Sequence, residues 1–350
     1  MENNHSHERI AITGANSFLN TLVLKRLSEL STVKEIHIFD MQPPSHMSTK
    51  CIFHRLDITK EKSCQSMAQT LLENNVSEFI HGALYSGPTR SRSVHHEVES
   101  IGTFHVLNAI AEAKIKRFVV HSSTFVYGAH PQNPNFMNES FITKYQKAHF
   151  VRTRVDVENQ IKDFSQNYPK CEVIVLRFAP ILGPNSTNVR ARYFMSGIVP
   201  KVFGYDPLLQ FIHEDDALRA QIMALFSKAT GVFNIVGRGV LPLSTGIHLS
   251  GKFPVSIFSG LCKTFFSGGY LMRAWELPSE MVPFFQYLCV ADGKKAENEL
   301  GFVAKYSSRQ ALKSMIEANR LREIGFSVPS ATLGEDEAYA TTHGFQKIQF

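Results

Sequence analysis

The sequence predicts a doubly wound α/β fold, in which helices cover both faces of a parallel sheet. Short β-rich runs alternate with longer helical stretches over the first 180 residues, and these runs are apolar along their whole length. Such strands are typical of parallel sheets that are buried on both sides. After Pro180 the pattern becomes less regular, which indicates a smaller C-terminal region laid against the sheet.

Each element of the expected sheet follows from a local pattern. RIAIT is a buried β-branched run, EIHIFD ends in an acid, and the stretch from 98 to 114 has apolar residues at helical spacing. The expected strands are 9–13, 35–40, 51–59, 78–84, 117–123 and 171–178. The expected helices are 18–30, 98–114 and 154–168. Strand follows helix at loop lengths that suit βαβ units.

The second half of the chain divides between the sheet and a covering region. Residues 1–180 form the nucleotide-binding core, and 208–237, a strand, a helix and a further strand, return to it. We expect 181–207 and 238–326 to form the smaller substrate-side region, and 327–350 to be a tail with some disorder. The Phe-rich stretch 255–272 could line an apolar pocket, lie on a membrane surface or be core. Its glycines interrupt an amphipathic face, so core is favoured.

Composition excludes several classes of protein. With 43% hydrophobic residues and a net charge of +6, the chain is neither disordered nor an obvious nucleic-acid binder, because its Lys and Arg are scattered. Five widely spaced cysteines favour a reducing, cytoplasmic environment. No signal peptide and no run of 18 apolar residues is found, so no stable membrane association is expected. His95-His96-Glu97 lacks the second histidine of a zinc motif, and no metal is predicted.

A glycine turn between the first strand and helix predicts a nucleotide site. Thr13-Gly14-Ala15-Asn16-Ser17-Phe18-Leu19 joins the two, an arrangement that sets a pyrophosphate on a helix N-terminus. Asp40 ends the second strand, where a carboxylate would accept hydrogen bonds from an adenosine ribose. A carboxylate there favours NAD over NADP, because it repels a 2′-phosphate.

The turn resembles the TGxxGxxG motif of the extended short-chain dehydrogenase/reductase family, the NAD-dependent epimerase/dehydratase type, with Ser17 and Asn20 at the second and third glycines. The resemblance extends over about residues 8–315. It rests on VVHSSTFVYG (119–128), IGTFHVLNAIAEAKIKRFV, LRFAPILGP (176–184), FIHEDDALRA (211–220) and ADGKKAENELGFVAKYSS (291–308). It implies a Rossmann-type sheet, and it places Asp57, followed by Ile58, where the family contacts adenine.

The resemblance also locates the family's catalytic residues, a serine and a YxxxK pair. Ser123 matches the serine. Glu158 sits where the family has a glutamate four residues after the lysine, which places Arg154 at the lysine and Phe150 at the tyrosine. Phenylalanine has no ionisable group and cannot exchange a proton. Arg154 could still hold a ribose or phosphate. A different register, through Tyr145, would put His149 at the lysine position.

Two functions therefore remain open. The first is an NAD-binding sensor, regulator or scaffold without ordinary redox turnover. The second is an active epimerase, dehydratase or reductase on a nucleotide sugar or hydroxysteroid-like alcohol, with His121, His149, Tyr127 or Tyr85 as substitute acid–base. Five basic residues face the substrate by family topology and could clamp a diphosphate: Arg90, Arg92, Arg190, Arg192 and Lys201. The family also implies a homodimer formed through 98–114 and the helix of Arg154.

Overall fold

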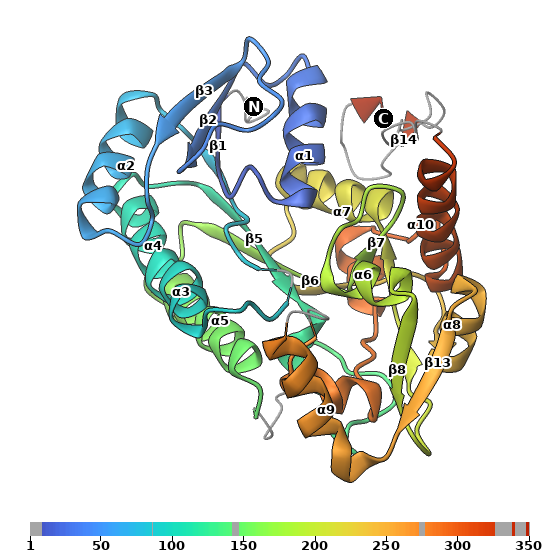
Figure 1. Ribbon diagram of the computed structural model, residues 1–350. Coiled ribbons are helices and arrows are strands. Elements are labelled where there is room, and N and C mark those ends of the chain that lie inside the picture. The colour runs from blue at the N-terminus through green and yellow to red at the C-terminus, as the bar shows by residue number, and fades with distance from the viewer. Residues whose placement is uncertain are drawn as a thin grey trace.

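The computed structural model contains a seven-stranded sheet in the order β11-β6-β5-β4-β1-β2-β3, and every neighbouring pair in it is parallel (Figure 1). The structure describes residues 9–85, 87–141, 147–272 and 277–325, together with the backbone of two short strands, 338–339 and 348–349. The strands of the sheet are β1 (Arg9–Thr13), β2 (Glu35–Asp40), β3 (Cys51–Arg55), β4 (Glu78–His81), β5 (Arg117–Ser123), β6 (Glu172–Phe178) and β11 (Gly231–Ile235). The predicted doubly wound α/β fold is confirmed.

Helices cover both faces of this sheet (Figure 1). One face packs against α1 (Phe18–Glu29) and α7 (Glu214–Phe226), and the other against α2 (Glu61–Glu73), α4 (Gly102–Glu112) and α5 (His149–Asn167). Of the sequence expectations, the strands 51–59 and 78–84 prove shorter, and the helix expected at 154–168 begins at His149. These differences lie at element ends, where sequence patterns are least informative.

The helix expected at 98–114 is interrupted. It consists of α3 (Arg92–His96), a π-helical turn η1 (Glu97–Ile101) and α4. A π turn inserts one residue per turn and rotates the side chains that precede it, and such turns are frequent at functional sites. Here the inserted turn carries Glu99, which is completely buried.

The C-terminal part of the chain contributes most of a second apolar cluster, in which Tyr193, Phe211 and Phe285 pack together with Phe125 and Phe150 of the first 180 residues. Its elements are β7 (Ile181–Leu182), α6 (Val189–Met195), β8 (Ile198–Val202), β9 (Leu208–Leu209), β10 (Ile212–His213), β12 (Leu241–Pro242), α8 (Leu243–Ser250), β13 (Phe253–Ile257), α9 (Ser259–Leu271), the 3-10 helix η3 (Ser279–Phe285), the π turn η4 (Ala296–Leu300) and α10 (Ser308–Glu323). The boundaries of the two regions stay a prediction. Most of the tail 327–350 lies outside the described residues; β14 (Ala338–Tyr339) and β15 (Ile348–Gln349) pair within it.

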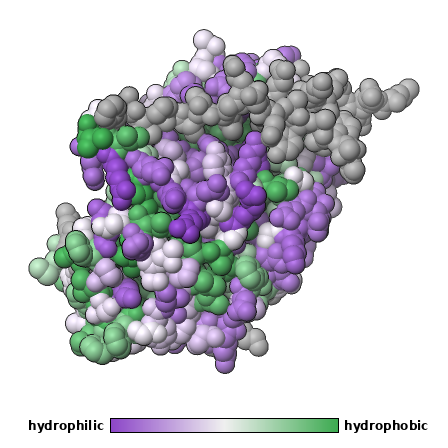
Figure 2. Space-filling view, turned by 90° about the vertical axis from the view of Figure 1, so that its right-hand side faces the viewer, coloured by the Kyte–Doolittle hydropathy of each residue, from purple (hydrophilic) through white to green (hydrophobic). Residues whose placement is uncertain are grey.

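The expectation that 255–272 is core proves wrong. Ile257, Cys262 and Phe266 are buried, but Val255, Phe258, Leu261, Leu271 and Met272 are exposed. Apolar composition did not reveal this, because a run that is apolar on every side gives no indication of which side faces water. In Figure 2, hydrophobic side chains gather towards the lower left of the face shown.

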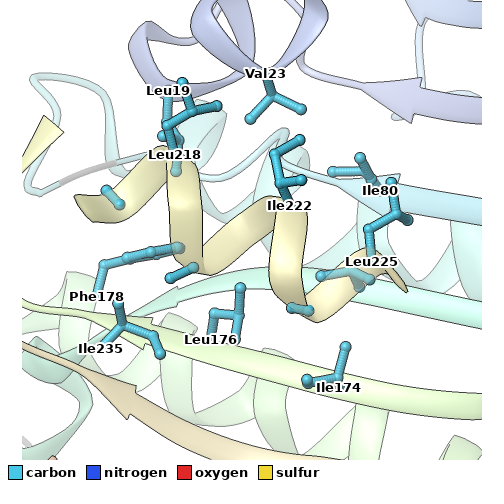
Figure 3. Packing of buried hydrophobic residues seen from close by; sticks show 14 of the residues in the cluster. Leu19, Val23, Ile80, Ile174, Leu176, Phe178, Leu218, Ile222, Leu225 and Ile235 are labelled. Carbon is cyan, nitrogen blue, oxygen red and sulfur yellow. The ribbon is translucent and has the colours of Figure 1, made fainter. Parts of the chain in front are cut away.

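The central helix α7 is nearly buried because it lies between the sheet and α1 (Figure 3). Leu218 and Ile222 point towards Leu19 and Val23 of α1, while strand residues such as Leu176 lie on the other side. This packing anchors the first turn of α1, which carries the predicted nucleotide site.

The turn before α1 depends on two glycines. Gly14 has a φ of +67°, and a Cβ there would lie 2.5 Å from the backbone nitrogen of Ala83. Asn20, fully buried, donates from Nδ2 to the carbonyls of Thr13 (3.1 Å) and Gly14 (3.0 Å). A Cβ on Gly82 would lie only 2.1 Å from this Nδ2. The bulk of Asn20 is therefore accommodated because the neighbouring strand end has no side chain at Gly82.

Candidate functional site

The first turn of α1 presents free backbone donors at the end of the sheet. Ser17 is the N-cap, and its Oγ accepts from the backbone nitrogen of Asn20 at 3.4 Å. Among the described residues, none accepts from the N–H groups of Phe18 and Leu19. Such N–H groups and the helix dipole favour an anion. Ser17 therefore caps the helix and leaves the N–H groups of Phe18 and Leu19 available to a ligand.

Asp40 lies beside this turn, as the sequence predicts. Its Oδ1 accepts from the backbone nitrogen of Met41 at 2.7 Å, and its Oδ2 lies 3.5 Å from the backbone nitrogen and from Nδ2 of Asn16. Asn16 donates more closely, at 2.9 Å, to the carbonyl of Gln42. The structure thus brings Asp40, Asn16 and Gly14 together at the carboxyl ends of β1 and β2.

Asp57 and Ile58 have clear structural roles. Oδ1 of Asp57 accepts from both the backbone nitrogen and Oγ1 of Thr59, at 3.0 and 2.8 Å, just before α2. Ile58 is buried, and a Cβ on Gly102 would lie 2.7 Å from its Cδ1. Their predicted contact with adenine stays a prediction.

The three residues predicted at the catalytic positions line one small pocket. Ser123 comes from the end of β5, and Phe150 and Arg154 from the first turns of α5. The lining residues of this pocket, which we call the Ser123 pocket, are Tyr85, Gly87, His95, Ser123, Phe125, Phe150 and Arg154. The alternative residue Tyr145 lies outside the described residues.

Phe150 belongs to an aromatic cluster. Its ring centroid lies 5.8 Å from those of both Phe125 and Phe284, which are themselves 5.0 Å apart, and the side chain is only 5% exposed. Edge-to-face and tilted contacts of this kind stabilise a core. The side chain at this position acts as packing and offers no proton.

Arg154 is held by a buried carboxylate. Its Nη2 lies 2.5 Å from Oε1 of Glu99, its Nε lies 3.2 Å from Oε2, and Nη2 also donates to the carbonyl of Tyr85 at 2.6 Å. Glu99 in turn accepts from the backbone nitrogen of Tyr85 at 2.7 Å. The Nε and Nη2 donors expected to hold a ribose or phosphate are thus already engaged within the protein.

Three of the proposed substitute acid–bases have other roles. Burial lowers the pKa of His121 to about 4, so its imidazole is neutral. Burial also raises the pKa of Tyr127 to about 12, and its hydroxyl donates to Asn234 at 2.7 Å. The backbone nitrogen of His149 donates to Glu280 at 3.0 Å, at the start of α5. None of these three side chains lines the Ser123 pocket.

His95 is the pocket residue that sequence reasoning missed. It is 2% exposed, stacks on the Tyr85 ring at 5.3 Å between centroids, and has a buried Nδ1 without a hydrogen-bond partner among the described residues. Its Nε2 lies 3.5 Å from Oε1 of Glu99. Burial, the main cause, lowers the pKa of His95. In the sequence, His95-His96-Glu97 is interpreted only as an incomplete zinc motif, and nothing in it indicates that His95 lies in this pocket.

Glu158, which served to locate the pair, anchors a second buried network. Its carboxylate accepts from Oγ of Ser122 at 2.5 Å and pairs with the guanidinium of Arg177. Arg177 also donates to the Tyr127 hydroxyl at 2.9 Å. This network connects α5 to β5 and β6, and the carboxylate of Glu158 is the group that binds both Ser122 and Arg177.

A second pocket, the Arg190 pocket, shares Phe125 with the first. It is lined by Phe125, Pro180, Arg190, Leu208, Leu209, Gln210, Phe211, Phe284, Tyr287 and Cys289. The guanidinium of Arg190 lies over the rings of Phe125 and Phe285, no carboxylate of the described chain pairs with it, and its Nη1 is buried without a partner. Burial lowers the pKa of Arg190 to about 10.

The other predicted substrate-facing cations do not reach these pockets. Arg90 stacks on Tyr270 and Arg92 pairs with Glu280, while Arg192 and Lys201 lie on α6 and β8. Within the described ranges, no group of three potential ligands could hold a metal ion. No helix in that part of the chain is long and apolar enough to span a membrane.

The buried ion pair leads to a stability prediction. Replacing Arg154→Met leaves the buried carboxylate of Glu99 without its ion-pair partner, so we expect a loss of about 3–5 kcal/mol in the free energy of unfolding by urea. The double variant Glu99→Gln/Arg154→Met should lose less, because no buried charge remains. Arg9→Met, which breaks the half-exposed pair with Glu35, is the control and should cost about 1 kcal/mol or less. Equal losses in the single and double variants would contradict the assignment.

Sequence comparison identifies proteins that are similar to this chain over most of its length. The chain is 27% identical over 323 residues to the uncharacterized protein Rv0501 of Mycobacterium tuberculosis, covering 90% of this chain and 85% of that protein. It is 21% identical over 363 residues to short-chain dehydrogenase/reductase family 42E member 1 of Xenopus laevis, covering 97% and 90%.

Solved structures share the fold. MoeE5 in complex with UDP-glucuronic acid and NAD matches with a TM-score of 0.70 and 19% identity, covering 90% of this chain and 99% of that one. UDP-glucose 4-epimerase of Thermotoga maritima matches with a TM-score of 0.69 and 17% identity, with the same coverage. The model of the NAD dependent epimerase/dehydratase family matches residues 10–236. The predicted resemblance is confirmed, and the chain belongs to this family.

Proposed function

We propose that this protein binds NAD and a small-molecule ligand but lacks the Tyr/Lys redox catalysis of its family, acting as a sensor, regulator or scaffold. The observation that carries the proposal is the state of two side chains. Phe150 is packed between aromatic rings, and Arg154 is bound by Glu99. Phe150 has no proton to exchange with a substrate, and Arg154 has no neighbouring tyrosine at position 150 whose pKa it could lower.

The nucleotide end of the site supports NAD. The free N–H groups at the start of α1 suit a pyrophosphate, and the carboxylate of Asp40 suits an adenosine ribose. The glycine turn keeps its positive φ at Gly14, and Asn20 is accommodated inside the protein. NAD would supply a hydride-accepting nicotinamide. In the Ser123 pocket this chain offers the hydroxyl of Ser123 and the phenol of Tyr85, whose pKa burial raises, but no phenol at position 150.

The Arg190 pocket supports an anionic ligand such as a nucleotide sugar. A buried guanidinium without a carboxylate partner is costly unless an anion joins it. Solved relatives contain UDP-glucose and UDP-glucuronic acid. A homodimer through α4 and α5 is part of the same proposal, and the exposed side chains of Ile101 and Phe104 support it. The cytoplasmic location stays a prediction, in keeping with the five free cysteines.

A second candidate function is an active enzyme that uses His95. Its side chain lines the Ser123 pocket and carries a buried nitrogen with no partner in the described chain, so it can exchange a proton with a bound alcohol. The reaction would be an epimerisation, dehydration or reduction on a nucleotide sugar or hydroxysteroid-like alcohol.

Cofactor binding is tested by titrating NADH and NADPH and following the nicotinamide fluorescence. We expect NADH to bind more tightly than NADPH, and Asp40→Ala to weaken NADH about tenfold, the value of a charged hydrogen bond. Glu73→Ala, an exposed acid on α2, is the control and should have no effect. Absence of NADH binding to the unmodified protein would refute the proposal.

Turnover separates the two candidate functions. We expect no turnover of sugar nucleotides or hydroxysteroid-like alcohols by the unmodified protein, and measurable turnover by Phe150→Tyr/Arg154→Lys, which restores the phenol and keeps a cation near Glu99. Phe125→Tyr/Arg154→Lys is the matched control, since it adds the same hydroxyl at a neighbouring ring. Turnover by the unmodified protein that His95→Asn abolishes would instead establish the second candidate.

A further inference from the structure

An unusually apolar surface covers one edge of the C-terminal region. Its large exposed side chains come from β13, α9 and the adjoining strand β8, and we call it the β13–α9 surface. Four of them are strongly exposed: Phe253 at 79%, Phe258 at 64%, Leu271 at 84% and Met272 at 81%. The others are Ile198, Phe203, Val255, Leu261 and Phe265. Contiguous exposed patches of this kind mark interaction sites.

The outward face of α9 is apolar in a helical pattern. Phe258, Leu261, Phe265 and Met272 follow one another at spacings of three, four and seven residues, so they lie along one side of the helix. The opposite side holds Cys262, Phe266 and Gly269, which are buried. A surface helix normally carries polar residues outward. Burial of apolar side chains within the described chain accounts for Cys262 and Phe266 but not for the strongly exposed Leu261 and Met272.

The strands extend the same surface. β13 pairs in parallel with β8, which places Phe253 beside Ile198. At the end of the two strands the rings of Phe203 and Phe258 lie 5.0 Å apart. The apolar side chains of the helix and of the strand pair therefore form one continuous surface.

The two segments that form this surface carry charges of one sign. Residues 196–204 and 250–272 contain Lys201, Lys252 and Lys263 and neither Asp nor Glu. A second copy of the chain would bring these lysines against one another across a twofold axis, because a symmetric interface pairs a patch with itself. Anionic lipid headgroups are complementary to apolar side chains flanked by lysine.

We infer that the β13–α9 surface docks on an anionic lipid bilayer, with its aromatic and aliphatic side chains at the headgroup boundary. This inference does not depend on the proposed function. It reverses the expectation of no membrane association, which rested on the absence of a long apolar run. The docked helix also lies close to the Ser123 pocket, because Phe266 of α9 contacts Phe285 of η3, and the adjacent Phe284 contacts Phe150.

The test is co-sedimentation of the full chain with vesicles of phosphatidylcholine containing about 30% phosphatidylserine. We expect binding, and about tenfold weaker binding for Phe258→Ser/Leu261→Ser, which changes only exposed side chains. Phe136→Ser/Leu72→Ser, exposed elsewhere, is the matched control and should bind as the unmodified protein does. Lys252→Gln/Lys263→Gln should also weaken binding about tenfold, unlike Lys62→Gln/Lys170→Gln.

Three results would overturn the inference. The first is no sedimentation with these vesicles. The second is binding that the surface and control variants weaken equally. The third is a dimer in analytical ultracentrifugation that Phe258→Ser/Leu261→Ser converts to a monomer while lipid binding is unchanged, since the occupant would then be a second copy of the chain.

Discussion

The buried ion pair between Glu99 and Arg154 is the constraint on which the Ser123 pocket depends. It joins the π turn η1, the loop at Tyr85 and the helix α5. Within the described chain, no other charged side chain contacts all three of these elements. A buried ion pair overcomes its desolvation only when the geometry is close and the remaining lone pairs are satisfied. The backbone of Tyr85 supplies both a donor and an acceptor, so this condition is met. Together with the pair between Glu158 and Arg177, the Glu99–Arg154 pair holds α5, and with it Phe150, against the sheet.

The packing around α5 accounts for the side chains at the two positions predicted for the family's tyrosine and lysine. At the tyrosine position, the ring of Phe150 completes a cluster with Phe125 and Phe284. At the lysine position, the guanidinium of Arg154 forms two contacts with one carboxylate, a geometry that lysine does not offer. The turn before α1 accommodates a residue larger than glycine, since Asn20 fits beside Gly82. The structure therefore explains how Phe150, Arg154 and Asn20 fit at positions where the family resemblance implies other residues.

The sheet was predictable because its strands are apolar on both faces and its turns are local. Asp40 was predictable beside Gly14 because parallel strands end at the same edge. The joint position of Ser123, Phe150 and Arg154 followed from the family resemblance and from Glu158. The Glu99–Arg154 pair was not predictable, because the residues are 55 positions apart and a π turn, which has no sequence signal here, orients Glu99. The exposure of α9 was missed for a related reason, since a helix with apolar residues on every side has no pattern that indicates which side faces the core.

A crystal structure of the protein in complex with NAD would decide whether Arg154 binds the protein interior or the cofactor. We expect the guanidinium of Arg154 to stay within hydrogen-bond distance of Glu99 and Tyr85. We also expect Phe150 to keep its contacts with Phe125 and Phe284, and Asp40 to contact the adenosine ribose. An Arg154 side chain that leaves Glu99 and contacts the nicotinamide ribose would contradict this expectation.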